Sequence, residues 1–172
     1  MVIRNRCRRQ FEPLFSNPLL AEADHIVLAL RWSESSINYL PGFLEKLSSV
    51  SGARIVVADR TAEFPNIPLL ALDYGQVEGF DRYAAEVRSK ELKVLNEKIV
   101  SIAKSSSVTL ISRYSAVCNP EGTSCAMFDD NQEMLLYDEG HWSVSGAKYF
   151  GRVMRRSGQL GPLGMPSIET AH

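Results

Sequence analysis

Residues 25–59 read HIVLALRWSESSINYLPGFLEKLSSVSGARIVVAD, and this stretch decides the fold. It opens with an apolar run at 25–30 and closes with another at 54–59, each typical of a strand covered on both faces. Between the runs, apolar side chains recur at helical spacing, which predicts a helix. Its apolar positions are Ile37, Leu40, Phe43, Leu44, Leu47 and Val50. Because proline does not fit a helix interior, we expect this helix to start close to Pro41.

The rest of the chain continues the alternation of helix and strand. Residues 60–82 lose any regular period, so we expect a long irregular excursion there, of a kind that often forms a functional loop. The other predicted elements are a short helix at 17–23, a strong helix at 83–104, a strand at 108–112, a short edge strand at 134–137 and a closing helix at 143–156.

This alternation indicates an α/β fold, a three-layer sandwich in which a mainly parallel, flavodoxin-like sheet carries helices on both faces. In such sheets the chemistry lies beyond the carboxyl ends of the strands. Three segments follow predicted strands and should converge on one rim: 31–33, 59–60 and 113–115. The length of 172 residues suits one domain, which we expect at 1–157, with a loose tail at 158–172.

Charge and hydropathy exclude several classes of partner. The formal net charge of −1 argues against nucleic acid or an anionic membrane, because both require a basic face. No apolar run approaches the roughly 20 residues that span a bilayer, and the first ten residues lack the apolar core of a signal peptide. Expressed as written, the chain would stay in the cytoplasm.

The three cysteines are an odd number. Cys118 and Cys125 enclose a short loop with proline and glycine, which suits a local disulfide and hence an oxidising compartment. Two unpaired buried thiols are the alternative. A zinc site is disfavoured because no second cysteine pair and only three histidines are present, so we expect no metal. Cys7 would be left over.

The chemistry-bearing pattern is Asp138-Glu139-Gly140-His141, a D-x-x-H spacing in a loop that leads into a helix. Acyl transfer needs an imidazole that takes the nucleophile's proton and a carboxylate that orients the ring. One short loop could supply both, with Gly140 giving the backbone freedom to fold the aspartate back on the ring. The alternative is a surface loop in which the aspartate caps a helix.

The context of this loop resembles a known family. Residues 136–147, LYDEGHWSVSGA, resemble the last sequence block of the SGNH (GDSL-like) hydrolases, in particular the SGNH domains fused behind acyltransferase-3 membrane domains. That block reads approximately Y-x-D-x-x-H-L-S-x-x-G-A and follows a short cysteine pair; here Trp142 replaces the leucine. Residues 26–33, IVLALRWS, resemble the strand end V-I-L-A-x-R-W of the same subgroup.

The resemblance implies O-acetylation of a bacterial surface polysaccharide, by an acyltransferase or esterase that needs no cofactor. His141 would be the general base and Asp138 its orienting carboxylate. Arg31 and Trp32 would line the substrate rim or replace part of the oxyanion hole; an ion pair and a packing role are their alternatives. Ser33 stands where other SGNH enzymes carry an oxyanion-hole asparagine. The implied partners are a glycan acceptor, an acyl donor and the membrane domain, with activity outside the inner membrane.

One part of the family pattern is missing. Its nucleophile belongs to a Gly-Asp-Ser motif after the first strand, and this chain contains no Gly-Asp-Ser. We interpret Ser16 and Ser143 as helix caps. The sequence therefore predicts a partial SGNH domain without its first strand, inactive by itself. It is either a remnant of a longer acyltransferase or a degenerate domain that binds glycan or a partner protein. An unrelated flavodoxin-like binding domain finds no support from a glycine-rich phosphate loop.

Overall fold

A computed structural model describes residues 13–168 of the chain. Three parallel strands form the sheet in the order in which they occur: β1 (His25–Ala29), β2 (Arg54–Ala58) and β3 (Thr109–Ile111). Ile26 pairs with Ile55, and Ala58 pairs with both Ala29 and Ile111, so all three strands end at one edge. The predicted parallel α/β sheet is confirmed.

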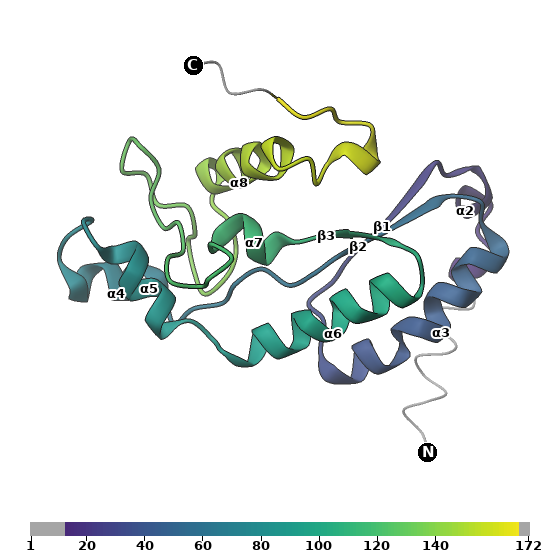
Figure 1. Ribbon diagram of the computed structural model, residues 1–172, viewed down its shortest axis with the longest axis horizontal. Coiled ribbons are helices and arrows are strands. Elements are labelled where there is room, and N and C mark those ends of the chain that lie inside the picture. Colours follow the sequence, from purple (N-terminus) through teal and green to yellow (C-terminus); the bar gives the residue numbers. More distant parts are fainter. Residues whose placement is uncertain (1–12, 169–172) are drawn as a thin grey trace.

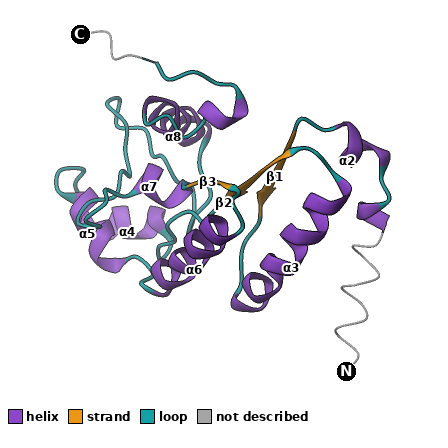
Figure 2. Ribbon diagram, turned by 45° about the vertical axis from the view of Figure 1, so that its right-hand side comes forward, coloured by secondary structure: helices purple, strands orange, loops and turns teal. Residues whose placement is uncertain are grey.

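Helices cover the sheet in two layers. Figure 1 shows α3 (Glu34–Val50) and α6 (Glu91–Ser105) below the sheet and α8 (Val144–Arg156) above it, and the turned view in Figure 2 agrees. The shorter helices are α2 (Pro18–Glu22), α4 (Ile67–Tyr74), α5 (Phe80–Val87), α7 (Arg113–Val117) and the 3-10 helix η1 (Gly161–Leu163). Within residues 13–168, none of the helices combines the length and apolarity needed to cross a bilayer.

Each face of the sheet has its own apolar core. Val56 and Val57 are neighbours on β2 and are both fully buried, but alternation along a strand sends them to opposite faces. Val57 packs with residues of α3 and α6, including Ile99, whereas Val56 belongs to the core that contains Phe150 of α8. The three-layer arrangement follows from this division.

β1 is exposed where the sequence predicted burial on both faces. Its five residues alternate between exposed and half-buried, and Val27 keeps 47% of its surface exposed. β2, the central strand, is buried over its last four residues. The prediction is therefore correct for β2 and wrong for β1, because β1 lies at the edge of the sheet and no other strand in the described part of the chain pairs with its free side.

Two helix boundaries differ from the prediction because capping and tertiary contacts override local preference. α3 starts at Glu34, not near Pro41. Ser33 and Ser36 form a reciprocal capping box at its start, and apolar residues on both sides of Pro41 are buried. The predicted single helix at 83–104 is interrupted at Arg88, which is extended (ψ 154°). There the Ser89 N–H donates to the Glu63 carbonyl at 2.8 Å, which pulls the chain away from the helix axis.

Three further expectations need correction. The excursion at 60–82 contains α4, which Asn66 caps and Gly75 ends with φ 77°. Residues 134–137 form isolated bridges rather than a strand of the sheet. The described part of the segment expected to be loose, 158–168, is held to the sheet, since the Pro162 carbonyl accepts hydrogen bonds from His25 and Arg54. Cys7 lies outside the described residues.

The disulfide between Cys118 and Cys125 is formed, as one of the two alternatives predicted. Ser143 is the N-cap of α8, the helix that follows the next loop. Its Oγ accepts the Gly146 N–H at 2.9 Å and donates to the Met134 carbonyl at 2.7 Å. This cap draws the first turn of α8 onto the loop. A Cβ at Gly146 would lie 1.9 Å from the Leu135 carbonyl oxygen, so only glycine fits.

We predict that Gly146→Ala destabilises the protein by about 2 kcal/mol or more, because the methyl group would force α8 away from the loop backbone. Gly151→Ala on the same helix is the matched control, since a Cβ there meets nothing within 4 Å. That change should stabilise by about 0.5–1 kcal/mol. Urea unfolding of both variants measures the difference, and equal effects would contradict the close packing at Gly146.

Candidate active site

Residues 138–141, here called the D-x-x-H loop, form the tip of a tight hairpin. Leu136 bridges Trp142, and the Tyr137 N–H donates to the His141 carbonyl at 3.1 Å. The Tyr137 ring also stacks on the imidazole, with centroids 5.7 Å apart and planes inclined by 15°. The hairpin therefore brings the aspartate and the histidine side by side before any tertiary contact is considered.

Asp138 uses both carboxylate oxygens within this loop. Oδ1 accepts the N–H groups of Gly140 and His141 at 3.0 and 2.8 Å, and Oδ2 lies 2.7 Å from His141 Nδ1. Because a carboxylate only accepts hydrogen bonds, Nδ1 carries the proton, and Nε2 is the basic nitrogen of the neutral ring. Nε2 has no protein partner in the described chain, and the His141 side chain is 75% exposed. Nε2 is therefore free to accept a proton from a ligand or from another group.

These hydrogen bonds also set the charge of the aspartate. The backbone N–H of Gly140 is the main cause that lowers the pKa of the Asp138 carboxyl below its ordinary value, and the N–H and ring of His141 add to it. Slight burial acts in the opposite direction and is outweighed. Asp138 thus remains an anion, able to stabilise an imidazolium on His141.

The segment after β2 holds the D-x-x-H loop in place. The Phe64 N–H donates to the Glu139 carbonyl at 2.7 Å, and the Trp142 indole N–H donates to Thr61 Oγ1 at 3.1 Å. The second bond explains the tryptophan found where the family pattern has leucine. Gly140 is needed for a close approach to this segment rather than for backbone freedom: its φ is not positive, and a Cβ would lie 3.0 Å from Glu63 Cγ.

A cleft of about 240 Å³ lies between the D-x-x-H loop and the ends of the strands. Its lining comes from the segments after all three strands, as the parallel sheet predicted: Ala29, Leu30, Arg31, Arg60, Thr61, Glu63 and Arg113, together with residues 138–141. A larger hollow of about 480 Å³ near α5 contains neither Asp138 nor His141. We place the site in the smaller cleft because the paired chemistry is there.

The three predicted rim residues separate in the structure. The Arg31 side chain lines the cleft and is 76% exposed, with a hydrogen bond of 3.3 Å to Glu63. Trp32 is only 2% exposed and donates its indole N–H to the Ala58 carbonyl at 2.7 Å, so it packs beneath the rim. Ser33 caps α3 and does not line the cleft. Arg31 is therefore the rim residue that the structure brings together with Asp138 and His141.

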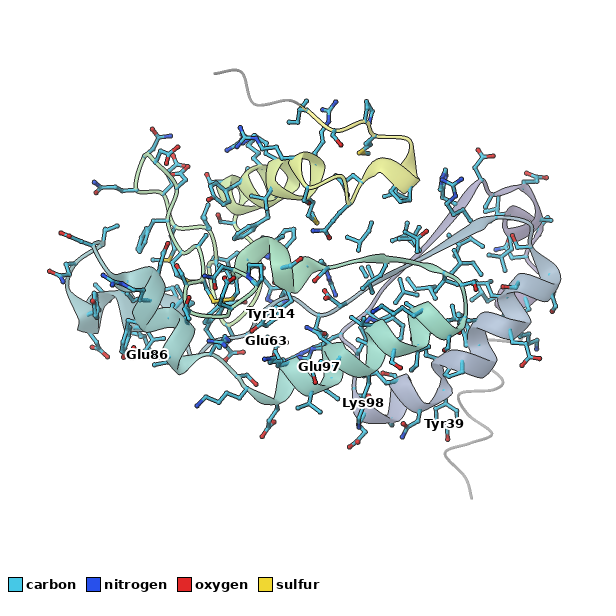
Figure 3. All side chains as sticks on the ribbon, viewed as in Figure 1. Tyr39, Glu63, Glu86, Glu97, Lys98 and Tyr114 are labelled. Carbon is cyan, nitrogen blue, oxygen red and sulfur yellow. A yellow bond between two sulfur atoms is a disulfide. The ribbon has the colours of Figure 1, made fainter. Side chains whose placement is uncertain are left out.

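Sequence reasoning missed Glu63, which lies beyond the carboxyl ends of the strands (Figure 3). Its carboxylate pairs with Arg31 and Arg60 together. Burial tends to raise the pKa of this carboxyl, but the hydrogen bonds and charges of the two arginines outweigh it and lower the pKa. The only feature of the sequence that could have indicated Glu63 as a site residue is its position four residues after the predicted strand at 54–59.

Asp59 is a fully buried carboxylate at the strand ends, whereas Glu63 is only half-buried. Its side chain accepts hydrogen bonds from Ser112 Oγ and from the N–H groups of Arg113 and Tyr114, at 2.6, 2.6 and 3.1 Å. Burial raises the pKa of Asp59, and these hydrogen bonds partly offset the rise. Asp59 thus joins the end of β2 to the residues that follow β3, and so holds Arg113, which lines the cleft.

No serine is present in the lining of this cleft within the described residues. Ser143 is the cap of α8, as predicted. Ser16 is not a cap: its Oγ donates to the Pro13 carbonyl at 3.1 Å, and Asn17 caps α2 instead. Across residues 13–168, no group of three or more His, Cys, Asp and Glu side chains is arranged to hold a metal ion.

A parallel α/β sandwich with an oriented Asp–His couple beyond the carboxyl ends of its strands defines a hydrolase-like or acyltransferase-like domain. In a comparison with protein families, residues 3–156 match the model of the SGNH domain (fused to AT3 domains). The chain belongs to this family and is an acyl-transfer-related domain. A comparison with curated proteins yields no match.

Among solved structures, the chain is similar to the lipopolysaccharide acetyltransferase periplasmic domain of Salmonella ser. Paratyphi A. The TM-score is 0.60 at 16% sequence identity, and the match covers 76% of this chain. At that identity the similarity supports the fold. The chain spans 54% of the length of that domain, so about half of the neighbour has no counterpart in these 172 residues.

We predict that the Asp138 carboxyl titrates below its ordinary pKa of about 3.9 in the folded protein. A depressed folded-state pKa stabilises the loop above the unfolded value, and that contribution is lost as pH falls through the folded value. The ¹³C resonance of the carboxyl carbon measures the midpoint. In His141→Ala the midpoint should rise only part of the way, because the backbone donors remain. A wild-type midpoint at or above 3.9 would contradict the hydrogen-bonded loop.

Proposed function

We propose that this domain takes part in O-acyl transfer to, or ester hydrolysis on, a hydroxyl of a surface polysaccharide or similar glycan, with His141 as general base. The observation that carries the proposal is the Asp138–His141 couple at 2.7 Å, in which His141 lines a cleft at the strand ends and its Nε2 has no protein partner in the described chain. Membership of the SGNH family supports the reaction class.

In this mechanism His141 Nε2 takes the proton of a serine hydroxyl while the serine oxygen attacks the acyl carbonyl. The imidazolium then returns the proton to the leaving group, and an acyl-serine remains. In the second step His141 takes the proton of the glycan hydroxyl while the sugar oxygen attacks the acyl-serine carbonyl. The bond between the acyl carbon and the serine oxygen then breaks, and the imidazolium returns the proton to the serine oxygen. Asp138 stays ionised throughout and stabilises the imidazolium.

We assign the nucleophilic serine to sequence that is not among these 172 residues. Gly-Asp-Ser does not occur in the chain, and the cleft is lined without a serine hydroxyl over the described residues. The domain is then inactive by itself, because a triad without its nucleophile retains little acceleration. In this proposal the acyl donor reaches the cleft through an acyltransferase-3 membrane domain; the description of the family as fused to AT3 domains supports such a partner domain.

We infer that the domain works outside the inner membrane, and two observations support this. The structural neighbour is a periplasmic domain, and the Cys118–Cys125 disulfide is of a kind that persists in an oxidising compartment.

A non-catalytic domain is the second candidate, favoured by the absence of a serine from the cleft lining. Such a domain would bind glycan or a partner protein through the same cleft. The DNA upstream of the Met1 codon separates the two candidates. A frame, continuous or shifted by one base, that encodes apolar spans and then a strand ending in Gly-Asp-Ser supports acyl transfer; an unrelated gene or a promoter there supports the second.

Fluorophosphonate labelling provides the biochemical test. We expect no labelling and negligible p-nitrophenyl acetate hydrolysis by the 172-residue chain. The protein extended by its Gly-Asp-Ser segment should be labelled at that serine. There His141→Ala should lower the esterase rate by about 10³-fold or more, because His141 is the only imidazole in the described lining of the cleft and is the group that Asp138 orients.

His25→Ala is the matched control, since His25 bonds the Pro162 carbonyl and does not line the cleft. It should leave the rate of the extended protein within about twofold of wild type, a difference too small to reflect lost transition-state stabilisation. Strong labelling of the 172-residue chain would show that the nucleophile lies within it. An unchanged rate in His141→Ala would remove this residue from the mechanism.

A further inference from the structure

Three arginines line the cleft, and each follows a different strand: Arg31 follows β1, Arg60 follows β2 and Arg113 follows β3. We call these side chains the arginine wall. Because parallel strands end at a common edge, three positive charges far apart in sequence meet in one small site. The three guanidinium groups repel one another within the cleft, so their arrangement requires anions that compensate the positive charge.

Two members of the arginine wall are held by the protein. Arg60 donates to the Trp32 carbonyl at 2.9 Å and to the Glu63 carboxylate, and its Nε is buried without a partner within residues 13–168. Arg113 donates from Nε and Nη2 to main-chain carbonyls at the ends of β2 and β1, at 2.6 and 3.2 Å. These bonds fix both guanidinium groups in place.

Arg31 is the most exposed of the three arginines and has a single side-chain partner, Glu63. Its Nη2 donates to Glu63, whereas its Nε and Nη1 have no protein partner in the described chain. Arg113 Nη1 is also without a protein acceptor among those residues. Guanidinium donors are arranged in a planar fork that matches the two oxygens of a carboxylate or the oxygens of a phosphate. Unused donors therefore remain on a positively charged surface of the cleft.

In the segments that follow the strands, three guanidinium groups outnumber the two carboxylates, Glu63 and the buried Asp59. The lining of the cleft also includes Asp138 and Glu139, so the surplus of positive charge is local to the strand ends. Burial is the main cause that lowers the pKa of Arg113, and the neighbouring charge of Arg60 adds to the effect, against the opposing effect of Asp59. One more anion near the strand ends would relieve this crowding.

The other two carboxylates of the cleft, Asp138 and Glu139, belong to the D-x-x-H loop, where Asp138 is bound to His141. The cleft is thus positive along the arginine wall and negative in the D-x-x-H loop. A ligand that carries one anionic group would bind in a defined orientation. Its anion would lie on the arginine wall, and an uncharged hydroxyl would point toward the imidazole.

We propose that the arginine wall binds the oxyanion group of an acidic sugar, a carboxylate or a phosphate ester, and so presents a neighbouring hydroxyl of that sugar to His141. This inference rests on the proposed function, which it sharpens to an acidic glycan as acceptor. The volume of about 240 Å³ is below the roughly 300–1,000 Å³ of pockets for drug-sized ligands, which favours a single sugar unit over a longer saccharide as the group bound.

Binding can be tested on the 172-residue chain without catalysis. The probes are D-glucuronate, D-glucose 6-phosphate, neutral D-glucose and acetate, each followed through the arginine Nε–Hε resonances in ¹H–¹⁵N spectra. We expect glucuronate or glucose 6-phosphate to shift the Arg31 resonance. Glucose should cause no shift at the same concentration, and acetate should bind at least about tenfold more weakly than glucuronate, since it lacks the ring contacts. The stronger of the two acidic sugars identifies the oxyanion.

Two cleft variants give opposite expected signs. Arg31→Gln should weaken binding of the acidic sugar about tenfold, because it removes a charged fork, and Arg31→Lys should fall between, because it keeps only the charge. Glu63→Gln should strengthen binding severalfold, because it removes the competing carboxylate while keeping a hydrogen-bond acceptor. Arg152→Gln, an exposed change of the same charge on α8, should have no effect.

A purely structural role of the Arg31–Glu63 pair predicts that both variants weaken binding, and that result would overturn the proposal. Equal binding of glucose and glucuronate, or no shift with either acidic sugar, would also overturn it. Acetate as strong as glucuronate would show a site for small anions and no glycan subsite. These outcomes leave the labelling test of His141 untouched, so failure of this inference is distinguishable from failure of the proposed acyl transfer.

Discussion

The hydrogen bond from the Phe64 N–H to the Glu139 carbonyl joins the segment after β2 to the D-x-x-H loop, and the site depends on it. The loop alone orients its own imidazole, but nothing within it decides where that imidazole lies relative to the sheet. The Trp142 indole adds a second attachment at Thr61. Together these bonds place a flexible surface hairpin at the edge where all three strands end.

The same segment also organises the charges opposite the loop. Glu63 lies one residue before Phe64 and pairs with two arginines of the wall, while its Cγ packs close to Gly140. A single stretch of extended backbone therefore sets both the position of the base and the position of the cations. The D-x-x-H loop carries two carboxylates and the arginine wall carries three guanidinium groups, so the cleft has a negative part and a positive part. A ligand with one charged end would therefore bind in one orientation.

Local patterns predicted much of this molecule. Apolar runs predicted the strands, and the serine at 143, interpreted as a cap, marked the start of α8. The D-x-x-H spacing predicted an aspartate beside a histidine, because a three-residue separation lets a carboxylate reach back to the ring. The boundaries of α3 and the break at Arg88 were not predictable from periodicity, since a reciprocal cap and contacts with distant segments decided them.

The sequence by itself indicated the parallel sheet, because apolar runs alternate with segments of helical period along the chain. It also indicated the disulfide loop, as one of two alternatives, and the pairing within the D-x-x-H loop, because these two features depend on residues close together along the chain. Only the tertiary structure decided that Trp32 packs beneath the rim, that Arg31 faces the cleft, and that Glu63 belongs to the site. Burial and charge pairing depend on which segments meet at the strand ends. Spacing along one chain contains no such information until the sheet has formed.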